Sequence, residues 1–220
     1  PISGVAESAK GFGNAQVPPD EDGIYRRLSL IDSLDSRVIP SISLKVVSDL
    51  KSFKSIGWPQ RKNMQIDGKI LPLDADGMMM INYYGGTDTF PNYPLAGIIS
   101  SAFQIANGEE PQISPEVVKD KIVVFGLAAP GLYDMKPSPI SKVYPGPEVH
   151  ATVMENLMRG DFIRPFRAHA TFAVALFSSA VASLGLAWIA TSWGVAIFMI
   201  LVLASIVGSS FLLFSNGIWM

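Results

Sequence analysis

The sequence predicts a mixed α/β domain, with a βαβ crossover in its sheet and flanking helices, followed by a transmembrane helical hairpin. Two observations lead to this fold class. Apolar strand-like runs lie on either side of an amphipathic helical pattern at residues 94–106, and every Lys, Arg, Asp and Glu precedes residue 168. Because a strand, a helix and a strand in this order form a right-handed crossover, we expect a parallel pair of strands in the first part.

The distribution of charge sets the boundary between the two parts. The chain has 220 residues with 17 Lys and Arg and 19 Asp and Glu, and the last of these side chains is Arg167. A water-soluble surface needs polar and charged side chains, which the last quarter of the chain lacks. We therefore assign residues 1–167 to a folded domain and residues 168–220 to a membrane region. The chain begins at Pro1 rather than Met, so we expect a truncated N-terminus, with any signal segment or anchor outside the chain.

Two apolar runs, 171–190 and 195–214, predict the transmembrane helices. Each has 20 residues, and about 30 Å of helix matches the thickness of the hydrocarbon core. Because the connection between them is short, the helices form a hairpin, and the apolar residues after Gly217 predict the start of a third span. A pair of buried core helices is the alternative. Arg164 and Arg167 mildly favour a cytoplasmic position for the domain.

Two hairpins are predicted in the first half of the domain. Strands at 11–16 and 24–30 flank one turn rich in Asp and Gly, and strands at 71–73 and 78–84 flank another. Asp and Gly stabilise tight turns, since Asp bonds its own backbone and Gly accepts a positive φ. We therefore expect each pair of strands to form an antiparallel ladder.

One helix and one loop are predicted between these hairpins. Pro40 suits the first helical position, and residues 41–51 follow the helical period. Residues 52–70 are polar and irregular, which predicts a loop. The apolar side chains expected to face inward from the helix are Leu44, Val47 and Leu50.

The second half of the domain contains the predicted crossover. Residues 94–106 have apolar side chains at helical spacing, and residues 121–127 form a continuous apolar run typical of a strand covered on both faces. A loop rich in Pro and Gly follows at 128–145, and a helix is predicted at 147–159. Gly160 ends that helix, and the next few residues join the domain to the first membrane helix.

Composition excludes several classes of function. The net charge is −2 and there is no basic run, which argues against nucleic acid as a partner. The chain contains no Cys, so disulfides, thiolate metal sites and cysteine nucleophiles are excluded.

Three motifs look like ligand loops but lack the residues that the chemistry needs. Gly126 and Gly131 have the spacing of a phosphate loop, but Leu132 and the next residue stand where Lys and Ser or Thr are required. Residues 20–23 and 74–77 open like calcium loops, but the Gly comes too early and turn chemistry explains both. We therefore predict no metal site and no cofactor.

Four segments in series carry a family resemblance. They are GFGNAQVPPDEDGIYRR at 11–27, MMINYYGG at 79–86, KDKIVVFGLAAPGLYD at 119–134 and GPEVHATVMENLMRGDFIRP at 146–165. In this order and spacing they resemble the CHASE2 family of extracytoplasmic sensor domains, over about residues 11–167. The hydrophobic hairpin that follows also fits, because transmembrane helices usually come directly after the sensor in that family.

The resemblance implies a sensory input domain of a transmembrane signalling receptor. The output in that family is often a class III adenylate or guanylate cyclase and sometimes a histidine or Ser/Thr kinase, which would lie outside this chain, so we expect no enzyme activity in the chain itself. It also implies a multi-pass protein of the cell membrane with residues 1–167 in the periplasm or outside the cell, and this outweighs the two arginines. The implied partners are the lipid bilayer, a ligand or protein outside the cytoplasm, and a second copy in a homodimer.

A candidate ligand site lies where the predicted parallel strands end. In open α/β sheets, ligands bind outside the carboxyl ends of the strands. Residues from both strand ends, from the following loop and from the last helix would converge there. A well-packed structural loop, and a structural His150, are the alternative interpretations. The candidate residues are Tyr83, Tyr84, Gly85, Asp134, Lys136 and His150.

Two other functions remain open from the sequence. A membrane-anchored hydrolase could be assembled from Ser138, His150 and Asp134, although Ser138 lies in no nucleophile motif. The domain could also bind another envelope protein without signalling. Neither alternative has a motif of its own.

Overall fold

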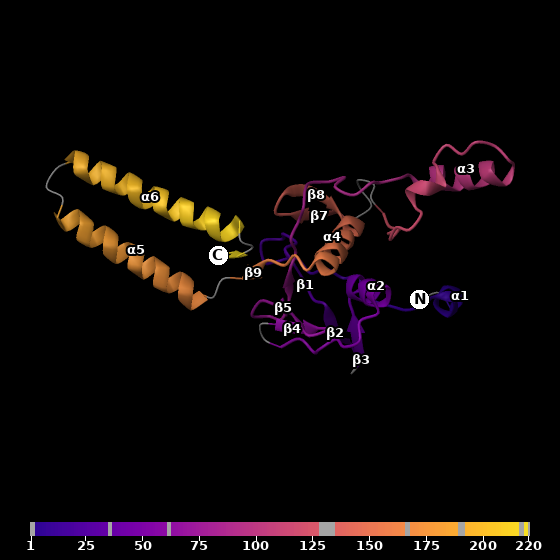
Figure 1. The fold of residues 1–220 in the computed structure, drawn as a ribbon, viewed down its shortest axis with the longest axis horizontal. Helices are drawn as coiled ribbons and strands as arrows, with labels where there is room; N and C mark the ends of the chain where they lie inside the picture. The colour runs from indigo at the N-terminus through magenta and orange to yellow at the C-terminus, as the bar shows by residue number, and fades with distance from the viewer. Residues whose placement is uncertain are drawn as a thin grey trace.

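The chain folds into a central α/β body with an arm on one side and a pair of long helices on the other. In the computed structural model the arm is built around α3 (Leu95–Ala106), and the long helices are α5 (Ala168–Trp188) and α6 (Ser192–Ser215) (Figure 1). A short N-terminal helix, α1 (Ser3–Ser8), lies on the same side as the arm. The structure describes residues 3–34, 37–60, 63–127, 135–165, 168–188, 192–215 and 218–219.

The strands of the described residues pair two by two rather than in one sheet. The fold class is mixed α/β, as predicted, but the sheets are small. Four of the pairs are antiparallel and one is parallel. The pairs are β1 (Arg27–Leu28) with β6 (Met79–Met80), β2 (Ile31–Leu34) with β3 (Arg37–Pro40), β4 (Asn63–Ile66) with β5 (Lys69–Pro72), β7 (Met135–Ser138) with β8 (Ser141–Pro145), and in parallel β9 (Arg164–Pro165) with β10 (Ile218–Trp219).

Two predicted helices, α2 (Ile42–Lys51) and α4 (Gly146–Arg159), pack against each other in the body. Ser41 rather than Pro40 begins α2, because its hydroxyl accepts a hydrogen bond from the backbone N–H of Leu44 (3.2 Å). Gly160 ends α4 with a φ of 73°, a left-handed conformation that suits glycine.

The core lies between these helices and the small sheets. Each large apolar side chain buried there contributes about 1.5–3 kcal/mol relative to exposure. Leu44 and Val47 of α2 are buried as predicted, but Leu50 is 58% exposed, so the prediction that it faces inward is wrong. The core side chains are Val17, Leu28, Leu30, Leu44, Val47, Met64, Ile66, Leu71, Leu73, Met79, Ile81, Tyr144, Val149, Val153, Met154 and Leu157.

Both predicted Asp-Gly turns form, but the strands around them pair differently from the prediction. Gly23 and Gly77 have φ values of 80° and 81°, as such turns require. Residues 11–16 do not pair with 24–30, because Asn14 instead bridges Ser41. The residues that follow the two turns pair with each other, as β1 and β6. Turn chemistry fixes the local bend and leaves the long-range partner open.

Three hairpins occur where loops were predicted or nothing was assigned. Residues 52–70 contain β4 and the start of β5, joined by a turn at Asp67 and Gly68, both at positive φ. The region 128–145 contains β7 and β8, and β2 and β3 follow β1. The Asp-Gly pair between Ile66 and Lys69 was a readable hairpin signal.

The predicted βαβ crossover is not confirmed among the described residues. The helix of the crossover is present as α3, but residues 121–127 have no strand partner among the described residues, and Phe125 is 75% exposed. The reason lies just after β6. The backbone N–H and C=O of Asn82 are both hydrogen-bonded to the side chain of Asn156 on α4 (3.0 Å each), which takes the place of a neighbouring strand.

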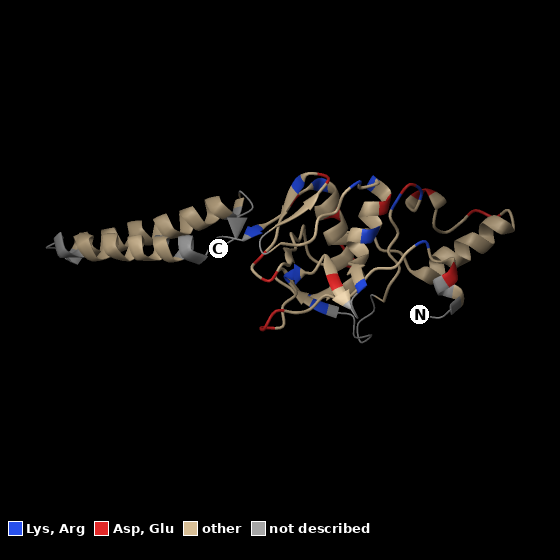
Figure 2. Ribbon diagram, turned by 90° about the horizontal axis from the view of Figure 1, so that it is seen from below, with Lys and Arg blue, Asp and Glu red and all other residues tan. Residues whose placement is uncertain are grey.

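The two C-terminal helices lie side by side and carry no charged residue (Figures 1 and 2). In α6, Trp193–Leu213 is long and apolar enough to cross a membrane, with 21 residues, a mean hydropathy of 2.5 and none of its most apolar stretch buried. Within the described part of α5, Ala175–Gly185 is a shorter apolar stretch. One predicted span is therefore borne out by length and composition, and the transmembrane hairpin is not confirmed.

Contacts hold α5 and α6 together near both ends of the pair. A Cβ at Gly185 of α5 would overlap the ring of Phe198 of α6, so glycine allows the helices to approach closely. At the domain end, β9 before α5 pairs with β10 after α6. Ile218–Trp219, which we expected to begin a further apolar span, forms that second strand.

Candidate functional site

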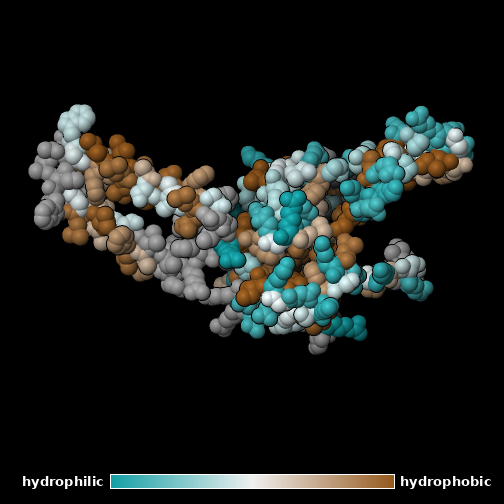
Figure 3. Space-filling model, in the orientation of Figure 1, coloured by the Kyte–Doolittle hydropathy of each residue, from teal (hydrophilic) through white to brown (hydrophobic). Residues whose placement is uncertain are grey.

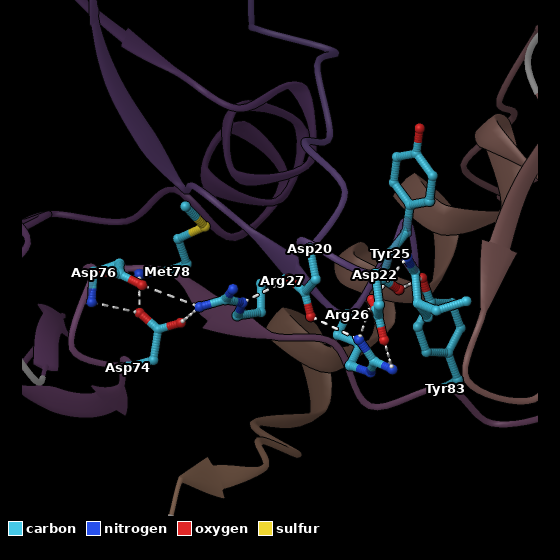
Figure 4. Close-up of polar contacts among 10 residues, drawn as sticks. Asp20, Asp22, Tyr25, Arg26, Arg27, Asp74, Asp76, Met78 and Tyr83 are labelled. Carbon is cyan, nitrogen blue, oxygen red and sulfur yellow. Dashed lines mark hydrogen bonds and ion pairs between the residues drawn. The ribbon is translucent and has the colours of Figure 1, made fainter.

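The two turns that look like calcium loops form an ion-pair cluster. Arg27 contacts Asp20 (2.8 Å), Asp74 (3.0 Å) and Asp76 (3.1 Å), and so links the two turns (Figure 4). Arg26 contacts Asp20 and Asp22, and its hydrogen bond lowers the pKa of Asp22 to about 2. Arginine supplies the positive charge that a metal ion would bring. No group of metal-binding side chains occurs among the described residues.

A pocket of about 290 Å³ lies between α2, α4 and residues 122–126, the segment that follows the arm. Its walls are mostly apolar, and its charged or titratable side chains are Lys136 and His150. An apolar cavity with a few polar groups is the usual form of a small-molecule site. The lining residues are Ala15, Ile42, Val46, Ile122, Val123, Val124, Phe125, Gly126, Lys136, Gly146, Pro147, His150 and Met154.

His150 is held at the pocket by one hydrogen bond at each of its ring nitrogens. Nε2–H donates to the carbonyl of Ala15 (3.0 Å), which can only accept. Nδ1 lies 3.1 Å from the hydroxyl of Ser43 on α2, and the same hydroxyl lies 3.3 Å from the His150 carbonyl. His150 therefore fixes α4 against α2 and against the N-terminal segment.

Lys136 reaches the pocket from β7 and stacks on an aromatic ring. Its Nζ lies 5.1 Å from the ring centre of Tyr25, a cation–π contact. Tyr83 donates its hydroxyl to the Tyr25 carbonyl (2.8 Å) (Figure 4). Its ring packs edge-on against Tyr144. Burial raises the pKa of the Tyr83 hydroxyl, so it remains a donor. Tyr83 thus supports the pocket through Tyr25 without lining it.

Tyr84 and Gly85 do not line the pocket. Tyr84 lies at the other end of α4, where its hydroxyl accepts from Asn156 (2.9 Å) and its ring faces Arg159. Gly85 lies against Thr89. Asp134 lies outside the described residues. Of the five predicted residues that the structure describes, two lie together at the pocket, Lys136 and His150.

The pocket walls from α2 and from residues 122–126 were not predicted. Ile42 and Val46 fall four residues apart on α2, so one helix face carries both, but the sequence does not say what that face covers. At Gly126 a Cβ would overlap the ring of Pro147, which indicates that this segment lies directly on the start of α4.

The hydrolase arrangement is not supported by the contacts of Ser138. Its hydroxyl donates to the carbonyl of Ser141 (3.2 Å) and accepts from the Ser141 N–H (3.0 Å), so it closes the β7–β8 turn. The serine that contacts the ring of His150 is Ser43, whose side chain is fully buried.

Glu148 is a buried carboxylate in the first turn of α4. Its Oε1 accepts a hydrogen bond from the backbone N–H of Asp88 (3.2 Å), and its Oε2 has no hydrogen-bond partner among the described residues. Burial raises the pKa of the Glu148 carboxyl, and the nearby charge of Asp88 adds to the rise against the opposing effect of that N–H. Asp88 itself has a φ of 65°, which is strained for a residue with a side chain.

We expect Glu148→Gln to stabilise the fold at neutral pH. Because the folded-state pKa is raised, the stability linked to this group is present below the unfolded value of 4.5 and is lost as the pH rises through the folded value. A glutamine side chain at this position cannot ionise, so the variant should gain on the order of 1 kcal/mol over wild type at pH 7. The measurement is urea unfolding between pH 4 and pH 8.

The exposed Glu110 provides the control, as Glu110→Gln. That variant should follow the wild-type pH profile throughout. If Glu148→Gln is less stable than wild type at pH 7, then Oε2 has a partner that requires the charge, and the interpretation of a buried unsatisfied carboxylate is wrong.

The described residues thus form a mixed α/β body with a small apolar pocket, followed by a helix long and apolar enough to cross a membrane. The family model described as CHASE2 domain matches residues 2–206, so the chain belongs to the CHASE2 domain family. CHASE2 domains are extracytoplasmic sensory domains. The match confirms the resemblance and includes α5 and part of α6. Comparisons with curated proteins and with solved structures gave no match.

Proposed function

We propose that this chain is the sensory input region of a transmembrane receptor that regulates a cytoplasmic adenylate or guanylate cyclase or a kinase. Membership of a sensory domain family supports the input role. The pocket supports a small molecule as the stimulus, since its walls are apolar and two polar side chains enter it. In this proposal the domain binds a small molecule and transmits a signal, and it catalyses no reaction itself.

One observation carries the proposal: α4 takes part in both the pocket and the connection to the membrane region. Pro147, His150 and Met154 line the pocket from the first part of α4. The helix ends at Arg159, and α5 begins at Ala168. A ligand that binds one position of α4 better than another would therefore shift the equilibrium at the start of α5.

We include α5 as a second membrane span in this proposal. It lies beside α6, has 21 residues and carries no charge. Two spans would return the chain to the side of the body, and the pairing of β9 with β10 supports that arrangement. The body, the start of α5 and the end of α6 would then lie outside the cytoplasm.

The test is a side chain that fills the pocket. Val46 lines it from α2, and Val46→Phe adds a ring to the space that a ligand would occupy. We expect at least a threefold change in the cyclase or kinase output of the whole protein in membranes. Because overpacking costs about 1–3 kcal/mol, folding is checked by circular dichroism.

Val38→Phe is the matched control, because Val38 is an exposed β3 residue away from the pocket. It should leave the output unchanged. A folded Val46→Phe protein with wild-type output and a wild-type response would show that the pocket does not control the signal.

A further inference from the structure

The arm is a folded unit with one uncovered apolar side. Residues 107–114 turn back along α3, where the N–H of Ile113 donates to the buried hydroxyl of Ser101 (2.8 Å) and its side chain lies against Gly97. Gly97 and Ser101 are four residues apart, so the returning chain covers one face of α3. Another face carries a stripe of exposed apolar side chains at the same spacing, and these are Leu95, Ile99 and Phe103.

The chain that leaves the arm also carries exposed apolar side chains. Residues 122–127 run without helix, turn or bend, and Val123, Phe125 and Leu127 are all strongly exposed. These three alternate along the chain, as the side chains on one face of a strand do. Residues 122–127 make no backbone hydrogen bond to another described residue. Within the described part of the chain, their backbone donors and acceptors lie without a strand partner beside exposed apolar side chains, a combination that favours pairing with another strand.

The membrane that α6 would cross cannot cover this surface. The arm and the α5–α6 pair leave the body on opposite sides (Figure 1), and hydrophobic side chains show at the surface of both (Figure 3).

The size and charge of the surface fit a second copy of the chain. Seven large side chains at about 100 Å² each would bury roughly 700 Å² per copy, close to the standard size of a stable interface. Neither α3 nor residues 122–127 contain a charged side chain, so two identical surfaces meet without repulsion. The seven are Leu95, Ile99, Phe103, Val118, Val123, Phe125 and Leu127.

We propose that two copies of this chain associate through the arm, with their 122–127 segments paired antiparallel across a two-fold axis. An antiparallel pair of identical strands is self-complementary, as a two-fold interface requires. With the axis at Phe125, Val123 of one copy faces Leu127 of the other. The same segment forms a wall of the pocket, so a ligand in the pocket and a second copy of the chain would contact the same residues.

The absence of cysteine makes the register testable by disulfide cross-linking. Single-cysteine variants of the whole chain are reconstituted in liposomes and oxidised. Phe125→Cys should form a covalent dimer in most of the protein. A mixture of Val123→Cys and Leu127→Cys should form mixed dimers, whereas each alone should form few.

Ile70→Cys is the control, because Ile70 of β5 is 62% exposed and lies outside the arm. The proposal is overturned if Phe125→Cys cross-links no better than Ile70→Cys. A second variant, Phe125→Asp, should weaken dimerisation at least tenfold in sedimentation experiments in detergent, with unchanged circular dichroism, while Ile70→Asp should not. Equal dimerisation by the two Asp variants would also overturn it.

Discussion

Leu44→Ala should lower the free energy of unfolding by about 3 kcal/mol, since deletion of a buried leucine side chain leaves a cavity. Leu44 has no exposed surface and belongs to the core of the body. The measurement is urea unfolding of the whole chain in detergent, followed by circular dichroism.

Leu50→Ala is the matched control on the same helix. Leu50 is exposed, so its truncation should cost less than about 0.5 kcal/mol. The helical period alone places both leucines inward, whereas the structure separates them. Equal losses for the two variants would mean that α2 packs by the face that the sequence pattern predicts and not by the face seen here.

Asn156→Leu should destabilise the protein by a similar amount, about 3 kcal/mol, because it leaves buried polar groups without partners. The Asn156 side chain donates to the Asn82 carbonyl (3.0 Å) and to the Tyr84 hydroxyl (2.9 Å), and accepts from the Asn82 N–H (3.0 Å). Leucine has nearly the same size but replaces none of these bonds. Thermal and urea unfolding would measure the loss.

The exposed Asn92 supplies the control for this substitution. Asn92→Leu should change the free energy of unfolding by less than about 0.5 kcal/mol. If Asn156→Leu proves as stable as wild type, then the backbone of Asn82 finds another partner. Residues 121–127 would be the nearest candidate strand, and the predicted crossover would have to be reconsidered.

Local signals in the sequence were sufficient for the helices and the tight turns. The apolar period and a terminal glycine predicted α4 to within one residue, and the period with Asn107 and Gly108 did the same for α3. Gly23 and Gly77 marked turns that form as expected. Each of these features depends on residues that are close in the chain, so a short window contains the whole cause.

Pairing between distant segments could not be predicted in the same way. Arg27 joins two turns that are about fifty residues apart in sequence, and its three acidic partners are known only from the structure. A buried amide on α4 takes the place of a strand beside Asn82. Residues 121–127 have the composition of a central strand, but composition does not supply a neighbour.

The same contrast between local features and long-range contacts applies to the candidate site. Lys136 and His150 line the same pocket because β7 and β8 bring Lys136 to the start of α4. Tyr83 and Tyr84 were expected to act together, but neighbouring side chains in an extended segment point to opposite sides. Tyr83 therefore turns toward Tyr25, and Tyr84 turns toward Asn156 and Arg159.

The pairing of β9 with β10 determines how the helix pair can move. Arg164 before α5 is paired with Ile218 after α6, and the next residue of each strand continues the ladder. A shift of α6 along α5 by one turn, about 5.4 Å, would break both pairs. Tilting the two helices together breaks neither. The pairing therefore opposes sliding of one helix along the other, whereas motions that carry the two helices together leave it intact.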